Sequence, residues 1–567
     1  WRLRQLLAQQ LSGKHEAVIS ALTPLVNQWT RAEDLAAAFI LLGRSQLELG
    51  KVQEASESFL QASAKVPNAP PADEALLLLA SAYRRLGRTA DARTVLEKML
   101  AQFPNSPLAN RARFRLGEYC FALGDFEAAE KAYRAVIQSP DAGTLIPGAM
   151  YELACTLVKQ DRAPDAEKLL AELLAKNPDA ETAAKARYVR AVALRKLGNP
   201  AEAVRELQAA LQGSLGPLDH ADALYTLGLV QIDLKQYAEA AGTFAKLAAE
   251  HPDYPDADRV LYQWAWALKL DGRDDEAVEM FRKLVAQFPK SEHAAEARYH
   301  SGEAFYKSGD YFKAAEEFHK AVQAAGQSEL GEKASHRLGW AYYQMKQYEN
   351  AQKTFAYQRA AYPRGPLAAD AQFMEAESFF QLGKYAEALA GYEKLPQLSS
   401  DGFRILHRLH AGQAAAQLKQ WNQASDFLTQ CLKDYPDAPE SAEVLYELGN
   451  VYRNRGDNAK ALDYFSQAAA RSQGVTGAKA QFMIGELHFL EKKYDEAVKS
   501  FFRVAYGFDS PDLAAVQADA TFEAALCLEL LNRPQQAAQL YREVLEKFPQ
   551  SDKVKLAQAK LEGLTRQ

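Results

Sequence analysis

A small residue, Gly or Ala, recurs along this chain at a nearly constant interval, and this repeat limits the possible folds more than any other feature. The interval is 37 residues through the first ten positions and then 36, 37, 36 and 40. The positions are Gly43, Ala80, Gly117, Ala154, Ala191, Gly228, Ala265, Gly302, Gly339, Ala376, Gly412, Gly449, Gly485 and Ala525. A fixed period of this length indicates stacked structural units, so we expect a repeat protein rather than one globular core.

Each repeat has the pattern of two helices joined by a tight turn. Residues 111–122 carry apolar side chains with the helical period, and Gly124 then ends that helix. A second helix is expected over 126–136, with Ala129 as its own recurring small residue. The position of Gly124 is occupied in the other repeats by Gly50, Gly87, Gly198, Gly272, Gly309, Gly383 and Gly456, or by Asp161, Lys235, Lys346, Lys419, Lys492 and Asn532.

Serine and proline mark where many of the first helices are expected to begin. Proline follows many second helices and cannot continue them, and Ser106 then stands directly before Pro107. We predict that Ser106 is the N-cap of the next helix, with Pro107 at its first position, and that Ser291 and Ser551 play a similar role.

With its small residue, turn glycine, alanine, aromatic residue and final proline, the repeat resembles the tetratricopeptide-repeat (TPR) family. The resemblance implies an all-α, right-handed α-solenoid of about 14 stacked helical hairpins with a C-terminal capping helix. We expect a degenerate N-terminal hairpin over 1–35, the array of repeats over 36–549 and the capping helix over 550–567. The resemblance to the TPR family also implies a non-catalytic scaffold that binds other proteins.

The period of 37 residues is longer than the common TPR period of about 34. The longer repeat resembles that of bacterial envelope TPR proteins, namely the lipoprotein of outer-membrane β-barrel assembly and the periplasmic TPR partner of the Tol–Pal system. Residues 548–563 are similar to the last helix of the second group. This implies an adaptor in the periplasm or at the outer membrane, in assembly, secretion, polysaccharide export or motility. The alternative is a cytoplasmic, peptide-binding regulatory or chaperone-like TPR protein.

Composition and motifs argue against other classes of function. The 67 basic and 73 acidic residues are spread along the chain, so no surface for nucleic acid is expected. No motif for a nucleophile, a metalloprotease or a nucleotide is found, so we expect no enzyme, no cofactor and no metal site. The close pair His407 and His410 lacks an obvious third ligand. Any association with a membrane is expected through a partner or through an N-terminal anchor outside this sequence.

Aromatic residues in the middle of the array are the candidate binding surface for a partner protein or peptide. They lie on first helices, which line the concave face of a TPR array. Trp266, Trp340 and Tyr343 are bulkier than their equivalents in other repeats. The alternative is that such rings form a structural ladder between neighbouring hairpins. The candidates are Tyr225, Tyr262, Trp266, Tyr299, Tyr306, Trp340, Tyr343, Phe373 and Phe380.

Overall fold

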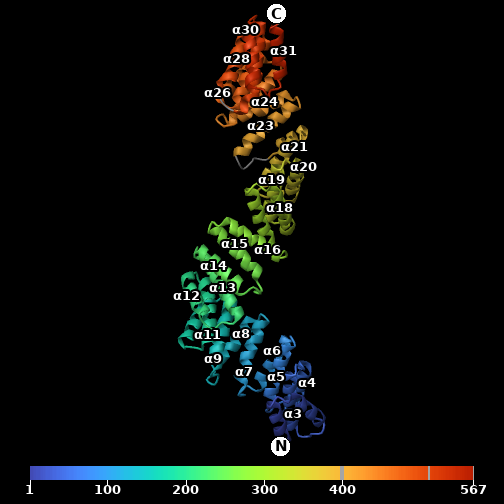
Figure 1. Cartoon of the computed structure of the whole chain (residues 1–567). Coiled ribbons are helices and arrows are strands. Elements are labelled where there is room, and N and C mark those ends of the chain that lie inside the picture. Colours follow the sequence, from blue (N-terminus) through green and yellow to red (C-terminus); the bar gives the residue numbers. More distant parts are fainter. Residues whose placement is uncertain (396–400, 509–510, 566–567) are drawn as a thin grey trace. The chain divides into compact units, whose positions relative to one another are not determined.

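The protein is an all-α repeat solenoid, as the sequence predicts. The computed structural model describes residues 1–395, 401–508 and 511–565, and within them it contains 31 α-helices, one short 3-10 helix and no strand (Figure 1). The chain divides into two units, Trp1–Gln287 and Phe288–Gln567. The repeat period shows no interruption at this boundary.

The first unit contains sixteen helices that pair in chain order (Figure 1). They are α1 (Arg2–Leu11), α2 (His15–Leu25), α3 (Ala32–Glu48), α4 (Val52–Lys65), α5 (Ala72–Arg85), α6 (Thr89–Gln102), α7 (Ala109–Ala122), α8 (Phe126–Ile137), α9 (Leu145–Lys159), α10 (Ala163–Ala175), α11 (Ala180–Lys196), α12 (Pro200–Leu211), α13 (Pro217–Asp233), α14 (Tyr237–Glu250), α15 (Ala257–Leu270) and α16 (Asp274–Gln287).

The second unit repeats this arrangement in its described residues. Its helices are α17 (Ala294–Lys307), α18 (Tyr311–Ala325), α19 (Glu329–Gln344), α20 (Tyr348–Ala361), α21 (Ala368–Gln381), α22 (Tyr385–Glu393), α23 (Asp401–Gln417), α24 (Trp421–Asp434), α25 (Ser441–Asn454), α26 (Asn458–Arg471), α27 (Val475–Leu490), α28 (Tyr494–Gly507), η1 (Pro511–Leu513), α29 (Ala514–Leu530), α30 (Pro534–Lys547) and α31 (Val554–Thr565).

The turn inside each hairpin has the left-handed backbone conformation that the sequence predicts. Gly124 has a φ of 77° and Gly309 a φ of 83°. Where the turn residue is not glycine, the backbone still takes this conformation, with φ values of 61° at Asp161 and 60° at Lys235. Equivalent positive values occur at Lys346, Lys419, Lys492 and Asn532. The position in the repeat therefore determines the turn, although glycine adopts it with the least strain.

The recurring small residue of the first helix lies against a large buried side chain of the second helix. An ideal Cβ on Gly228 would lie 2.5 Å from Cζ of Phe244, and one on Gly117 would lie 2.5 Å from Cε1 of Tyr133. Phe244 and Tyr133 have no exposed surface. The small residue thus lets an aromatic ring fill the space between the two helices, and each such pair anchors one hairpin.

The predicted serine caps are displaced from the helices that they were expected to start. Helix α7 begins at Ala109, with Leu108 as its N-cap, and the Ser106 hydroxyl accepts a hydrogen bond from the Leu108 amide at 3.0 Å. Ser291 and Ser551 likewise accept from His293 and Lys553. These serines therefore cap the short turn before the helix, because the chain after the proline makes one extra turn before the helix starts.

Two further findings concern the whole of the described chain. None of its helices has the length and apolar character needed to cross a bilayer. Cys120, Cys155, Cys431 and Cys527 are free thiols, and burial raises the pKa of Cys155 and Cys527 to about 12.

Candidate partner-binding surfaces

The aromatic column of the first helices packs mainly on the aromatic column of the second helices. The ring centroids of Tyr225 and Phe244 are 6.0 Å apart, and those of Tyr299 and Phe318 are 5.8 Å apart. The same relationship, nineteen residues along the chain, joins Phe114–Tyr133, Tyr262–Phe281, His336–Phe355, Phe373–Tyr392, Tyr446–Phe465, Phe482–Phe501 and Phe522–Tyr541. These pairs join the two helices of one hairpin, whereas the structural alternative placed them between neighbouring hairpins.

Trp340 lies in a hydrogen-bonded group on the first helix of its hairpin. Its indole Nε1–H donates to Nε2 of His336 at 3.0 Å, and Nδ1 of His336 lies 3.2 Å from Oε1 of Gln358. His336 therefore donates from Nδ1 and accepts at Nε2, so it is the neutral Nδ1–H tautomer. Burial lowers the pKa of His336 to about 4, which favours this neutral form.

Trp266 and Tyr343 also contact rings of their own units. Trp266 lies edge-on to Phe281, with ring centroids 6.3 Å apart, and the Lys269 ammonium stands 4.8 Å from the Trp266 ring. Tyr343 lies edge-on to Tyr348 at 5.2 Å. Both side chains remain half-buried, so each keeps part of its surface toward solvent.

Phe373 departs from the predicted surface, whereas Phe380 keeps an exposed part. Phe373 is 2% exposed and lies 4.9 Å from the Phe403 ring, so it belongs to the core and offers no surface to a partner. Phe380 stacks on His410 at 5.5 Å. Tyr262, Tyr299 and Tyr306 are half-buried. The candidates fall in both units: Tyr225, Tyr262 and Trp266 in the first, and Tyr299, Tyr306, Trp340, Tyr343, Phe373 and Phe380 in the second.

A cavity of about 930 Å³ lies elsewhere, on the first helices of the N-terminal hairpins. Helices α3, α5 and α7 supply most of its wall, and Glu152 of α9 completes it at one side. Gln10, Leu11 and His15 from the first hairpin also line it. The Gln10 amide donates to the Ser45 hydroxyl at 2.9 Å, which fixes α1 on α3 beside the cavity.

Five arginines and three glutamates line this cavity. Arg44 pairs with Glu74, and Nη1 of Arg115 pairs with Glu118 at 2.7 Å. The remaining three, Arg84, Arg85 and Arg111, are exposed and form no ion pair with the carboxylates of the described residues. The cavity therefore holds three guanidinium groups that are free to bind anionic groups from outside.

Glu152 and Tyr133 are two further polar residues of the cavity wall. Burial, together with the charge of Glu118, raises the pKa of Glu152 to about 7. Two other atoms of the wall, Oη of Tyr133 and Nδ1 of His15, are shielded from solvent and have no hydrogen-bond partner among the described residues.

The sequence contained a signal for this cavity that the aromatic pattern concealed. The positions one and four residues after the recurring small residue carry the middle-array aromatics Trp266, Trp340, Tyr306 and Tyr343. In the N-terminal repeats the same two positions supply Arg44 and Leu47, Ser81 and Arg84, and Glu118 and Phe121, all of which line the cavity. A search of these positions for charge as well as for rings finds the cavity.

His407 and His410 do not converge on a common point. Nε2 of His407 lies 2.9 Å from the Tyr392 carbonyl oxygen, whereas Nδ1 of His410 lies 2.7 Å from Oε1 of Glu377. The Tyr392 hydroxyl donates to the same Glu377 oxygen at 2.6 Å. Each histidine thus has its own structural partner, and the pair holds no metal-binding geometry.

Comparison with protein-family models gives matches along most of the chain. One model, described as tetratricopeptide repeat, matches residues 40–107, 77–143, 151–217, 188–255, 336–402, 409–476 and 446–514. A second model of the same description matches residues 259–291 and 519–551. No curated protein matches the chain significantly.

Solved structures resemble the chain at low identity. The APC/C hetero-tetramer Cut9–Hcn1 matches at 17% identity over 96% of this chain and 98% of that chain, with a TM-score of 0.32. A tetratricopeptide repeat protein from Parabacteroides merdae matches at 18% identity over 48% of this chain and 98% of that chain, with a TM-score of 0.32. The Pseudomonas aeruginosa pilF structure matches at 19% identity over 41% of this chain and 96% of that chain, with a TM-score of 0.31.

Proposed function

The chain belongs to the tetratricopeptide-repeat family, and from this premise we propose that it is a non-catalytic scaffold that holds an acidic segment of a partner protein in the arginine-lined cavity of its first unit. The observation that carries the proposal is the set of three exposed arginines, Arg84, Arg85 and Arg111, which have no carboxylate partner in the part of the chain that the structure describes. Guanidinium groups bind carboxylates in a bidentate manner, so an acidic side chain or a C-terminal carboxylate suits them.

The shape of the cavity supports a peptide segment as the ligand. The wall is made by first helices of successive hairpins, α3, α5 and α7, so the cavity follows the repeats. Leu47, Leu78 and Phe121 add apolar contact between the charged groups. A segment that alternates acidic and apolar side chains therefore matches the wall, and a scaffold needs no reaction chemistry to hold it.

Site-specific photo-cross-linking in the native cell tests this proposal. Ser81 lines the cavity, so Ser81→p-benzoylphenylalanine places a photoreactive group inside it. Thr94 on α6 is exposed and is not part of the cavity wall, so the same replacement there is the matched control. We expect Ser81 to cross-link an acidic segment of one partner that Thr94 does not reach. The proposal is contradicted if both positions cross-link the same partners, or if the segment cross-linked from Ser81 contains no acidic residues.

We further propose that the scaffold works in a bacterial cell-envelope complex, in the periplasm or at the outer membrane. The support is the 37-residue period and the similarity of residues 548–563 to the envelope TPR proteins named above. Osmotic-shock fractionation of the native cell, followed by immunodetection, tests the location. Recovery with the periplasm or outer membrane supports it, whereas recovery with the cytosol supports the alternative of a cytoplasmic regulatory or chaperone-like protein.

A further inference from the structure

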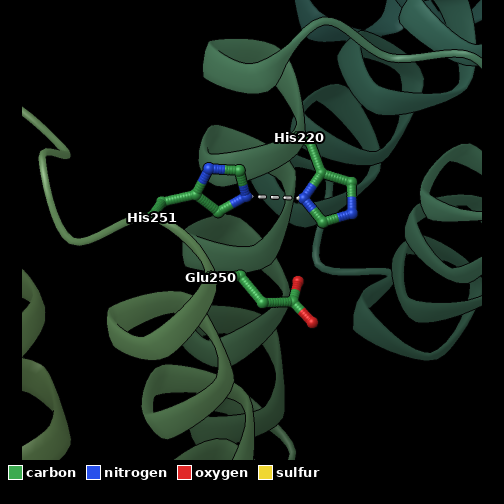
Figure 2. A group of neighbouring side chains, drawn as sticks. All are labelled: His220, Glu250 and His251. Atoms are coloured by element: carbon green, nitrogen blue, oxygen red, sulfur yellow. Dashed lines mark hydrogen bonds between the residues drawn. The ribbon is translucent and has the colours of Figure 1, made fainter.

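Two histidines and a glutamate meet at the open end of the hairpin formed by α13 and α14 (Figure 2). His220 lies in the first turn of α13, Glu250 is the last residue of α14, and His251 follows it directly. Nδ1 of His220 lies 2.9 Å from Nε2 of His251. One potential ligand atom from each of the three residues lies within 4.8 Å of the others, and among the described residues they are the single group of three such side chains.

The backbone holds these side chains in place. The His251 amide donates to the Leu247 carbonyl oxygen at 2.9 Å, so His251 remains attached to the end of α14. Tyr254, in the connector to α15, donates from its amide to the His251 carbonyl oxygen at 3.1 Å. Its hydroxyl donates to Oδ1 of Asp222 on α13 at 2.7 Å. The connector is therefore bound to both helices of the hairpin, and the two imidazole rings are brought together by ordered elements.

The distance between the two ring nitrogens suits a shared metal ion. Without a metal, one imidazole donates its N–H to the other, which explains the observed 2.9 Å. Two nitrogens bound to one tetrahedral zinc ion, at about 2.0–2.1 Å each, lie about 3.3 Å apart. The rings thus need to separate by only a few tenths of an ångström, which small side-chain rotations provide.

We propose that His220, Glu250 and His251 form a binding site for a divalent transition-metal ion of the zinc type. His220 supplies Nδ1, His251 supplies Nε2 and Glu250 supplies a carboxylate oxygen, which leaves the fourth tetrahedral position to water. Two imidazoles with one carboxylate favour Zn²⁺, Co²⁺ or Ni²⁺ over Mg²⁺ and Ca²⁺, which prefer oxygen ligands only.

The charges around the site are compatible with metal binding. Lys246 is the nearby cation, with its Nζ 3.9 Å from Oε1 of Glu250. This long contact is easily replaced because both side chains of the pair are about half exposed.

A metal bound here would clamp the connector to the start of α13. A ligand that binds only the folded hairpin stabilises it by an amount that grows with the logarithm of the free ligand concentration above the dissociation constant, so metal binding raises the stability of this part of the first unit. The site uses none of the residues of the arginine-lined cavity, and the two proposals stand or fall separately.

Zinc titration of the full chain in competition with a chromogenic chelator tests the site. We expect one Zn²⁺ per chain, lost in His220→Ala and in His251→Ala, and weakened about tenfold or more in Glu250→Gln. His319→Ala is the matched control, since His319 is exposed on α18, lies 3.0 Å from Nε2 of Gln323 of the same helix and is not part of the site. Co²⁺ should give the intense visible absorption of a tetrahedral site in the unchanged protein and in His319→Ala, and should not give it in His220→Ala or His251→Ala.

Circular dichroism shows whether the alanine variants fold. If they do not, zinc binding is measured in the conservative variants His220→Gln and His251→Asn, which keep the polarity of the hairpin end. Zinc bound with unchanged stoichiometry after both histidines have been replaced overturns the proposal. So does the absence of stoichiometric zinc binding to the unchanged, folded chain.

Discussion

The indole Nε1–H of Trp340 donates a hydrogen bond to Nε2 of His336 at 3.0 Å, one helical turn away on α19. The His336 ring in turn packs edge-on against the buried Phe355 of α20, with centroids 5.7 Å apart. Trp340 is thus linked to the centre of its hairpin, which gives it a structural task whether or not a partner also contacts it. Trp340→Phe keeps an aromatic ring but removes the donor. It should lower the free energy of unfolding of the second unit by about 1 kcal/mol in urea denaturation.

The neutral state of His336 predicts a specific loss of stability in acid. Its pKa is about 4 in the folded chain and 6.5 in the ordinary state, so the unfolded chain takes up a proton first as the pH falls. The neutral His336 therefore contributes up to about 3 kcal/mol to the free energy of unfolding. This contribution is complete above pH 6.5 and is lost as the pH falls toward 4. Phenylalanine occupies the same repeat position in Phe114 and Phe482, so His336→Phe is a natural replacement.

Urea denaturation of both proteins at pH 7 and pH 4.5 measures the effect of His336. On acidification, His336→Phe should lose less stability than the unchanged chain. The carboxylates are the same in both proteins, so their protonation lowers the stability of both equally. Identical losses in the two proteins would show that His336 takes up its proton in the folded state as readily as in the unfolded state.

Substitution of two glycines in one hairpin tests whether the small residue of the first helix packs against the aromatic ring of the second helix. Gly228 faces the Phe244 ring, and a Cβ there would lie 2.5 Å from it, whereas a Cβ on Gly242 meets nothing within 4 Å. Gly228→Ala should therefore destabilise the first unit by about 1–3 kcal/mol. Gly242→Ala, on the exposed face of α14, should stabilise it by up to about 1 kcal/mol. Thermal denaturation that ranks the two variants in the opposite order would contradict the packing described here.

The raised pKa of Glu152 predicts that an acidic ligand binds the cavity more weakly as the pH rises. Below pH 7 the carboxyl is largely protonated and neutral, and above pH 7 it is an anion that repels the ligand. Between pH 6 and pH 8 the affinity for a glutamate-rich peptide should fall by about fivefold, from roughly 1 kcal/mol of repulsion. In Glu152→Gln this fall in affinity should be smaller, because the variant has no carboxyl at this position to become an anion. Fluorescence anisotropy of a labelled peptide measures both curves, and parallel curves would refute the assignment.

Much of the fold could be predicted because the repeat encodes it locally. The left-handed turns at Gly124 and Asp161 follow from one repeating pattern. The packing of Gly228 against the ring of Phe244 was not predicted and is found only in the structure. The exact helix starts did not follow, because Ser106 caps a turn and α7 begins at Ala109. The division of the array after Gln287 had no signal in the repeat period.

The binding surfaces were less accessible to prediction, because they depend on neighbours in space. Phe373 has the spacing of its surface counterparts, yet it is buried against Phe403 of a later helix. The arginine-lined cavity combines residues of successive repeats, so no single repeat reveals it. His220 and His251 are 31 residues apart and come together only when the hairpin closes.

The central claim is that Arg84 and Arg111 hold an acidic segment of a partner, and a charge exchange tests it most directly. Binding of a labelled six-glutamate peptide and of a six-lysine peptide is measured at low salt, to the unchanged chain and to Arg84→Glu/Arg111→Glu. Arg205→Glu is the matched control, since Arg205 is an exposed arginine of α12 outside the cavity. We predict that the double variant loses at least about tenfold in affinity for the glutamate peptide and gains binding of the lysine peptide, while the control changes neither. Equal affinity of the double variant and the unchanged chain for both peptides would contradict the account.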